Sequence, residues 1–238
     1  MPTSWIKNVR DAHELTIVAT DTVRNGSWNN VFKKAIVEFN RLSGSMQLGV
    51  RFREVGDLPD PTSVNRGANV QFEAAAGTVH EITLKNKFGD IHGQFTEEVD
   101  GKAVHGLTMP QIWRNDKGQK EQFRAYIYVP KAPEFNVGPA GKSVNREVGD
   151  GVKLFIAVHE MVHACGLGDG KNQEHTDEGP DSDLFIAQPQ PFPGAIDKPE
   201  DDKLRIHLGP TVTLPKDPPN PPLFLSTRTA NLIKSIWT

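Results

Sequence analysis

The sequence predicts a single domain of mixed α and β structure, spanning residues 1–238 and built around one buried helix. Three features predict this fold class. A strand, a helix and a second strand follow one another in the first 55 residues, an apolar run leads into a His-rich helix near position 160, and the chain ends in an amphipathic helix. With 238 residues and 37% hydrophobic content, the chain is long enough to bury a core.

The first strand is predicted at Leu15–Thr20, where apolar and β-branched residues dominate. A helix follows from Ser27, a good N-cap residue, to about Leu42, because its apolar residues recur at helical spacing. Ser43-Gly44 is expected to end the helix, and Met46–Val55 alternates as a second strand. A strand, helix and strand in this order predict a parallel crossover.

The next segment combines a loop with further strands. Residues 56–69 are rich in Pro, Asp, Asn and Gly and are predicted to form a loop. Val70–Ala76 and Val79–Leu84 have the composition of strands. Residues 88–100 are polar and contain glycine, which indicates either a flap or a long loop.

A pair of strands is predicted ahead of the buried helix. Val104–Pro110 and Gln122–Val129 flank the turn-like Asn115–Gly118. Pro110 places the first of them at a sheet edge, because proline removes a ladder hydrogen bond from a central strand. His105 is then interpreted as an edge-strand residue in preference to a second metal site.

The helix near position 160 carries the chemistry of the sequence. On a helix, His159 and His163 lie one turn apart on the same face, so both imidazoles can bind one zinc ion. Glu160 reaches a water activated by that metal without being a ligand. Asp150 is the expected N-cap and Gly166 supplies a left-handed residue that ends the helix. The competing interpretation is a helix with two surface histidines.

The stretch from His159 to Gly166 resembles the metzincin clan of zinc peptidases. The resemblance implies a zincin fold with a twisted mixed sheet, an active-site helix, an upper subdomain of about 1–166 and a smaller lower subdomain of about 167–238 ending in a helix. It implies a zinc endopeptidase in which Glu160 is the general base. An extended polypeptide is then expected to bind along the edge strand.

The residues expected to bind that polypeptide are Val104, His105, Gly106 and Leu107. The segment that contains them resembles the edge strand above the cleft in matrixin-type metzincins. Main-chain pairing along such an edge holds many different sequences.

Two residues compete for the third zinc ligand. Asp169 follows Gly166 at the offset where the clan's third ligand belongs, and snapalysin-like metzincins use an aspartate there. His175 offers imidazole, the commoner ligand, and its surroundings resemble the matrixin stretch before the Met-turn. We prefer His175 and retain Asp169 as the alternative.

The sequence departs from the clan in two respects, the open third ligand and the Met-turn, and it leaves two other classes of protein open. No methionine follows Met161, so Leu184 or Phe185 is expected in place of the Met-turn residue. A gluzincin-like hydrolase would take Glu200 as its third ligand, but little amphipathic helix surrounds it. A non-catalytic zinc- or peptide-binding module would not need Glu160.

Composition limits the partners. The net charge of −3 comes from 27 basic and 30 acidic residues without a basic stripe, so we expect no nucleic acid partner. No run is apolar enough for a membrane span or a secretory signal, which predicts a cytoplasmic protein or a signal-independent export route. Residues 172–185 are acidic but lack an EF-hand pattern, so calcium is unsupported. We expect a monomer, and a small buried structural role for Cys165.

Overall fold

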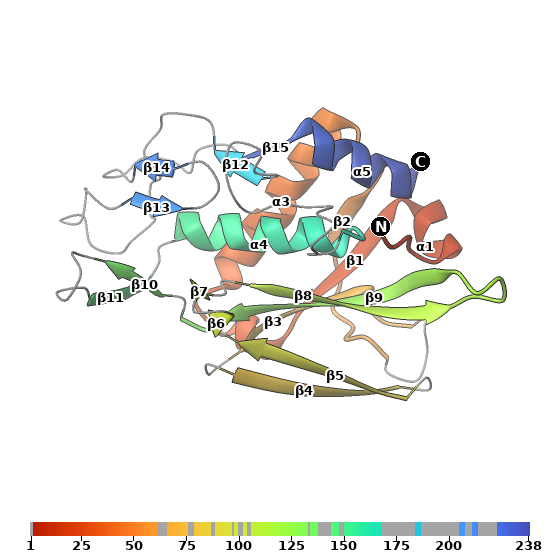
Figure 1. Ribbon diagram of the computed structural model, residues 1–238, viewed down its shortest axis with the longest axis horizontal. Helices are drawn as coiled ribbons and strands as arrows, with labels where there is room; N and C mark the ends of the chain where they lie inside the picture. The colour runs from red at the N-terminus through yellow and green to blue at the C-terminus, as the bar shows by residue number, and fades with distance from the viewer. Residues whose placement is uncertain are drawn as a thin grey trace.

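The computed structural model of the chain describes residues 2–60, 66–75, 79–86, 89–96, 98–99, 102–103, 106–132, 134–137, 144–147, 150–167, 184–186, 205–207, 211–213 and 223–238. Within these ranges the fold is a mixed α/β fold around a five-stranded sheet, as predicted (Figure 1). The strand order is β2 (Arg51–Glu54), β1 (Glu14–Ala19), β3 (Val70–Ala75), β9 (Lys120–Pro130), β8 (Leu107–Arg114). Neighbours pair in parallel except β8 and β9, which are antiparallel.

The other elements are helices and two-stranded sheets. The helices are α1 (Lys7–Ala12), α2 (Asp21–Arg24), α3 (Asn29–Met46), α4 (Asp150–Ala164) and α5 (Thr227–Trp237). The two-stranded sheets pair β4 (Val79–Asn86) with β5 (Gly89–Thr96), β6 (Glu98–Val99) with β7 (Lys102–Ala103), β10 (Glu134–Val137) with β11 (Val144–Glu147), β12 (Leu184–Ile186) with β15 (Leu223–Leu225), and β13 (Arg205–His207) with β14 (Thr211–Thr213).

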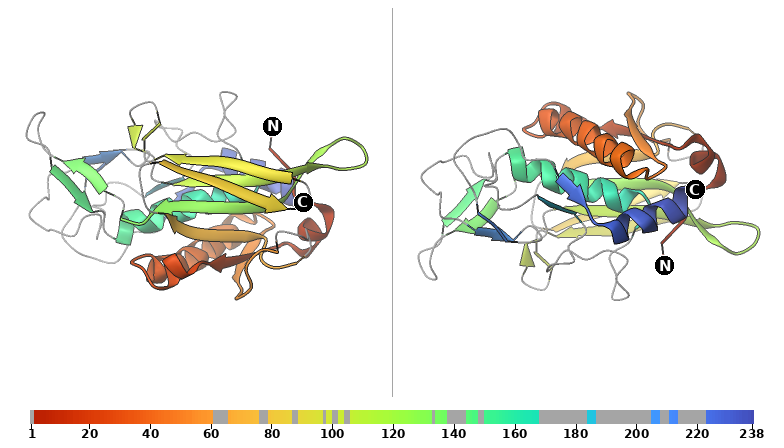
Figure 2. Two further views of the ribbon diagram at one scale, coloured as in Figure 1. Left: turned by 90° about the horizontal axis from the view of Figure 1, so that it is seen from below. Right: turned by 90° about the horizontal axis from the view of Figure 1, so that it is seen from above.

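The helices α3, α4 and α5 cover one face of the sheet, and the β4–β5 hairpin lies on the other side (Figures 1 and 2). The core fills the space between these helices and the sheet. Strand residues such as Ile17, Phe72 and Ile127 are buried there together with Phe32 and Phe39 of α3. Because successive side chains of a strand point to opposite faces, alternate strand residues enter this core and the others lie on the opposite side of the sheet.

The predicted crossover from β1 through a helix to β2 is confirmed, but the bounds of its helix are corrected. The helix begins at Asn29 and its N-cap position is Trp28, not Ser27, whose hydroxyl accepts instead from Lys153 Nζ on α4 at 3.3 Å. The helix also continues through Ser43-Gly44 to Met46. Ser43 is tolerated because its buried hydroxyl donates to the carbonyl of Val50. Gln47, with a φ of 55°, ends the helix instead.

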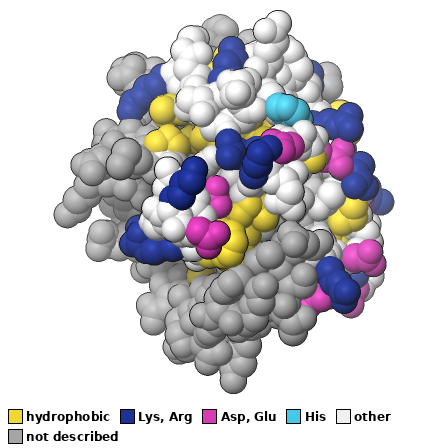
Figure 3. All heavy atoms as spheres, turned by 90° about the vertical axis from the view of Figure 1, so that its right-hand side faces the viewer, with side chains coloured by type: hydrophobic (Ala, Val, Ile, Leu, Met, Phe, Trp, Pro, Cys, Tyr) yellow, Lys and Arg dark blue, Asp and Glu magenta, His cyan; other side chains and the backbone are white. Residues whose placement is uncertain are grey.

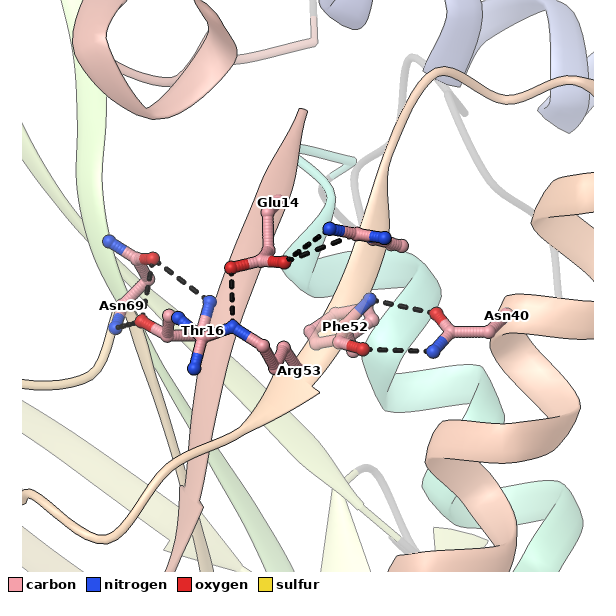
Figure 4. Close-up of polar contacts among 7 residues, drawn as sticks. Glu14, Thr16, Asn40, Phe52, Arg53 and Asn69 are labelled. Atoms are coloured by element: carbon pink, nitrogen blue, oxygen red, sulfur yellow. Dashed lines mark hydrogen bonds and ion pairs between the residues drawn. The ribbon is translucent and has the colours of Figure 1, made fainter. Parts of the chain in front are cut away.

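Side-chain hydrogen bonds and ion pairs join strand β2, at one edge of the sheet, to its neighbours (Figure 4). The carboxylate of Glu14 on β1 accepts from Arg51 and Arg53 on β2, at 3.0 and 2.6 Å. Asn40 of α3 bonds both the N–H and the carbonyl of Phe52, each at 2.8 Å. Strand β2 is therefore joined to β1 by ion pairs and to α3 by an amide, although it spans only four residues.

Two predictions for the middle of the chain, the loop or flap at residues 88–100 and the bounds of the edge strand at residues 104–110, are wrong in part. Residues 88–100 are not a flap or loop throughout, because β5 and β6 lie there and β5 pairs with β4 along its length. Pairing with a neighbouring strand overrides the weak strand propensity of a polar, Gly-containing sequence. Strand β8 begins at Leu107 and continues past Pro110 to Arg114, which an edge strand permits.

The surface that Figure 3 shows carries Lys and Arg side chains interspersed with Asp and Glu. None of the helices in the described ranges has the length and apolarity needed to cross a membrane.

Candidate metal centre

Helix α4 is buried along almost its whole length. From residue 153 to residue 167, every residue is buried except His159, which is partly exposed. The apolar residues Leu154, Ile156 and Val158 belong to the core, as the run ahead of the motif predicts. The competing interpretation, a helix with two surface histidines, is therefore excluded, because His163 is only 6% exposed. Within residues 153–167, His159 is the one residue that is partly exposed to solvent.

The two histidines of α4 converge on one point. Their Nε2 atoms lie 3.1 Å apart and their rings are almost perpendicular, at 73°. Two nitrogens bound at 2.0–2.1 Å to one tetrahedral zinc ion would lie about 3.3 Å apart. The spacing of one helical turn thus brings the two imidazoles to within a few tenths of an ångström of the separation that a shared metal requires.

The protonation of His163 also suits a metal. Its Nδ1 lies 3.1 Å from the carbonyl of Leu167, which can only accept a hydrogen bond. Nδ1 must therefore donate this hydrogen bond, which leaves Nε2 as the nitrogen that faces His159. A hydrogen bond of this kind fixes the tautomer and orientation of a metal-binding histidine.

Glu160 is held beside the two histidines at the edge of the sheet. Its side chain is only 4% exposed and its Oε2 lies 2.7 Å from the hydroxyl of Thr108 on β8. A Cβ added at Gly106 would lie 2.4 Å from Glu160 Oε1. The contacts with Thr108 and Gly106 show that the carboxylate lies on the side of α4 that faces β8.

The C-terminal end of α4 is capped by residues from distant parts of the chain. Gly166 has a φ of 110°, as the predicted left-handed residue, and its carbonyl accepts from the N–H of Thr3 at 2.8 Å. The indole of Trp5 donates to the carbonyl of Ala164, and that of Trp237 to the carbonyl of Cys165, each at 3.0 Å. Carbonyls that a helix end leaves without intrahelical partners are thus satisfied.

Cys165 is buried, as predicted. Burial raises the pKa of its thiol well above the ordinary value, and its Sγ lies 3.3 Å from the carbonyl of Met161. A neutral thiol is neither a good nucleophile nor a metal ligand. Its side chain packs in the main hydrophobic core.

Several of the predicted site residues lie outside the described part of the chain: Val104, His105, Asp169, His175 and Glu200. Among the described residues, no cluster of three or more His, Cys, Asp and Glu side chains is positioned to hold a metal. Of the candidate zinc ligands named from the sequence, the structure describes His159 and His163. Of the predicted substrate residues, Gly106 faces Glu160 and Leu107 packs against Tyr126 and Tyr128.

Sequence reasoning missed Thr108. The residue lies inside the predicted edge strand, but its partner Glu160 is 52 positions away. The alternation of β8 offers the one signal, because it places residue 108 on the same face as Gly106.

A scan of the sequence against protein-family models gives no match, and a search of curated proteins finds no similar sequence.

Proposed function

We propose that this chain is a zinc-dependent endopeptidase with a metzincin-like fold. The observation that carries the proposal is the convergence of two buried-helix imidazoles, 3.1 Å apart, with a buried carboxylate next to them in the chain. A tautomer fixed by Leu167 supports it, because that hydrogen bond leaves Nε2 of His163 to bind a cation. His175, or alternatively Asp169, would complete the ligand set.

Each residue has a distinct role. His159 and His163 hold the metal, which when bound supplies a Lewis acid that polarises water and the scissile carbonyl. Glu160 accepts the proton of the attacking water and delivers it to the leaving amine nitrogen as the peptide bond breaks. The carboxylate suits this exchange because β8 and α4 enclose it, which excludes competing bulk water.

The substrate is proposed to be an unfolded polypeptide. Strand β8 is the last strand of the five-stranded sheet, and Gly106 at its start adjoins Glu160. A peptide that adds a strand to this edge would pass the proposed catalytic carboxylate. Main-chain pairing would bring the scissile bond to Glu160 without demanding a particular sequence.

The test is zinc analysis combined with cleavage of denatured casein. We expect about one zinc ion per chain, chelator-sensitive cleavage, and at least a thousandfold loss of activity in Glu160→Gln with the zinc content unchanged, since Glu160 is a base and not a ligand. Glu54→Gln, at an exposed position on β2, is the matched control.

The outcomes separate the alternatives. Wild-type activity in Glu160→Gln would overturn the mechanism. Stoichiometric zinc without any cleavage would favour a non-catalytic binding module, and loss of zinc in Glu200→Ala would favour a gluzincin-like ligand set.

A further inference from the structure

Thr108 on strand β8 and Gly106, just before the strand, both lie against the carboxylate of Glu160. Side chains alternate along a strand, so residues 106 and 108 share one face and residues 107 and 109 share the other. Leu107 and Met109 pack with Tyr126 and Tyr128 on the face away from the main core. Gly106 and Thr108 consequently face α4.

The Thr108 hydroxyl has two acceptors within reach and one proton to donate. Its Oγ1 lies 2.7 Å from Glu160 Oε2 and 3.0 Å from the main-chain carbonyl of the same residue. The ionised carboxylate is the stronger acceptor and the closer one. Thr108 therefore donates to Oε2, and this bond points the carboxylate toward β8.

The other carboxylate oxygen lies against Gly106. A methyl group at position 106 would come within 2.4 Å of Oε1 and 2.7 Å of Cδ, distances that Cβ atoms do not adopt. Thr108 of β8 thus binds the carboxylate, and Gly106 just before the strand leaves the space that the carboxylate occupies. The two observations are independent, since one concerns a hydrogen bond and the other a steric gap.

We propose that Thr108 is a positioning residue that fixes the side chain of Glu160 for catalysis. This inference rests on the proposed function, in which Glu160 is the general base. A glutamate side chain has three rotatable bonds, and holding it in one rotamer carries an entropic cost that a charged hydrogen bond offsets. Without the hydroxyl, the carboxylate samples rotamers that point away from the attacking water.

The test compares Thr108→Val, which keeps the shape but lacks the hydroxyl, with Thr108→Ser, which keeps the hydroxyl. We expect kcat to fall on the order of 10- to 100-fold in the valine variant, with KM and zinc affinity close to wild type. The serine variant should recover most of the lost kcat. Thr16→Val is the matched control. Thr16 lies on β1, which two strands separate from β8 in the sheet, and its hydroxyl is hydrogen-bonded to Asn69.

A second measurement works whether or not the protein cleaves peptides. The mobility of the Glu160 side chain, measured by ¹³C relaxation in the zinc-loaded protein, should rise in Thr108→Val and return in Thr108→Ser. If the wild-type protein does not cleave casein but the variants show this pattern of Glu160 mobility, the proposed function is refuted and the positioning role of Thr108 is retained. Unchanged mobility in the valine variant would overturn the inference, as would a serine variant no better than valine.

Discussion

The indole N–H of Trp237, in the last turn of the chain, donates to the main-chain carbonyl of Cys165 at 3.0 Å. Cys165 follows the second histidine of the His-Glu-x-x-His motif by two residues, so the C-terminal helix is hydrogen-bonded to the turn that follows the motif. Trp5 lies beside Trp237, with ring centroids 6.4 Å apart, and bonds the preceding carbonyl. Both ends of the chain thus hold the same turn.

Trp237→Phe should weaken both the fold and the metal site. The substitution leaves the buried Cys165 carbonyl without this donor, which costs about 1–3 kcal/mol of unfolding free energy. Zinc affinity should fall several-fold, because the turn carries Leu167, the partner of His163. Calorimetry and zinc titration provide the two measurements.

Trp28→Phe is the control for that substitution. Trp28 is equally buried and donates to the carbonyl of Pro130 at 2.8 Å, away from the motif. It should lose a similar amount of stability and keep the zinc affinity of the wild type. Equal zinc affinity in both variants would show that the turn does not position His163.

The third ligand is decided by two single substitutions. His175→Ala should reduce zinc affinity by orders of magnitude, while Asp169→Ala should have a smaller effect, since imidazole is the preferred donor. Competition titration against a chelator gives both values. The reverse ranking would identify Asp169 as the ligand, and equal losses would indicate that one residue orients the other.

Gly106→Ala should reduce catalysis without unfolding the protein. The new methyl group displaces the end of the Glu160 side chain, which can rotate away at small cost in stability. We expect kcat to fall at least tenfold with zinc content unchanged. Gly44→Ala serves as the control, because open space surrounds Gly44 on helix α3. Wild-type kcat in Gly106→Ala would contradict the enclosed position of the carboxylate.

The thiol of Cys165 should be unreactive in the folded protein. Its pKa is raised by burial, so the thiolate is scarce at pH 8, and the side chain has no access to solvent. Iodoacetamide should label it only after unfolding in urea, as measured by mass spectrometry. Rapid labelling of the native protein would place the cysteine in an exposed position instead.

Glu38 should make stability depend on acid pH. Burial alone would raise its pKa, but hydrogen bonds from Arg41 and from the N–H of Leu223 on β15 lower it below 4.5. A lowered folded-state pKa gives stability that is present above the unfolded pKa and lost as pH falls through the folded one. The stability difference between wild type and Glu38→Gln should therefore shrink below about pH 4.5 in urea titrations. A stability difference that does not change with pH would show that the ionised carboxylate of Glu38 does not stabilise the fold.

The sequence by itself determined the elements whose signals are local. Spacing of four residues placed His159 and His163 on one helix face, Gly166 marked the turn after them, and apolar residues at helical spacing marked the last helix. The parallel pairing of β1 and β2 was predicted because an apolar strand pattern, a helical pattern and a second strand pattern follow one another in the sequence. In each case the cause lies within a few residues, so a short window contains it.

Tertiary structure alone decided the contacts that join distant segments. Ser43 remains inside a helix because Val50 accepts its hydroxyl, and residues 89–96 form a strand because β4 pairs with them. Thr108 meets Glu160 across 52 positions because the sheet edge passes beside α4. Hydrogen bonds between chain segments depend on how the core packs, and the composition of either segment does not specify its partner.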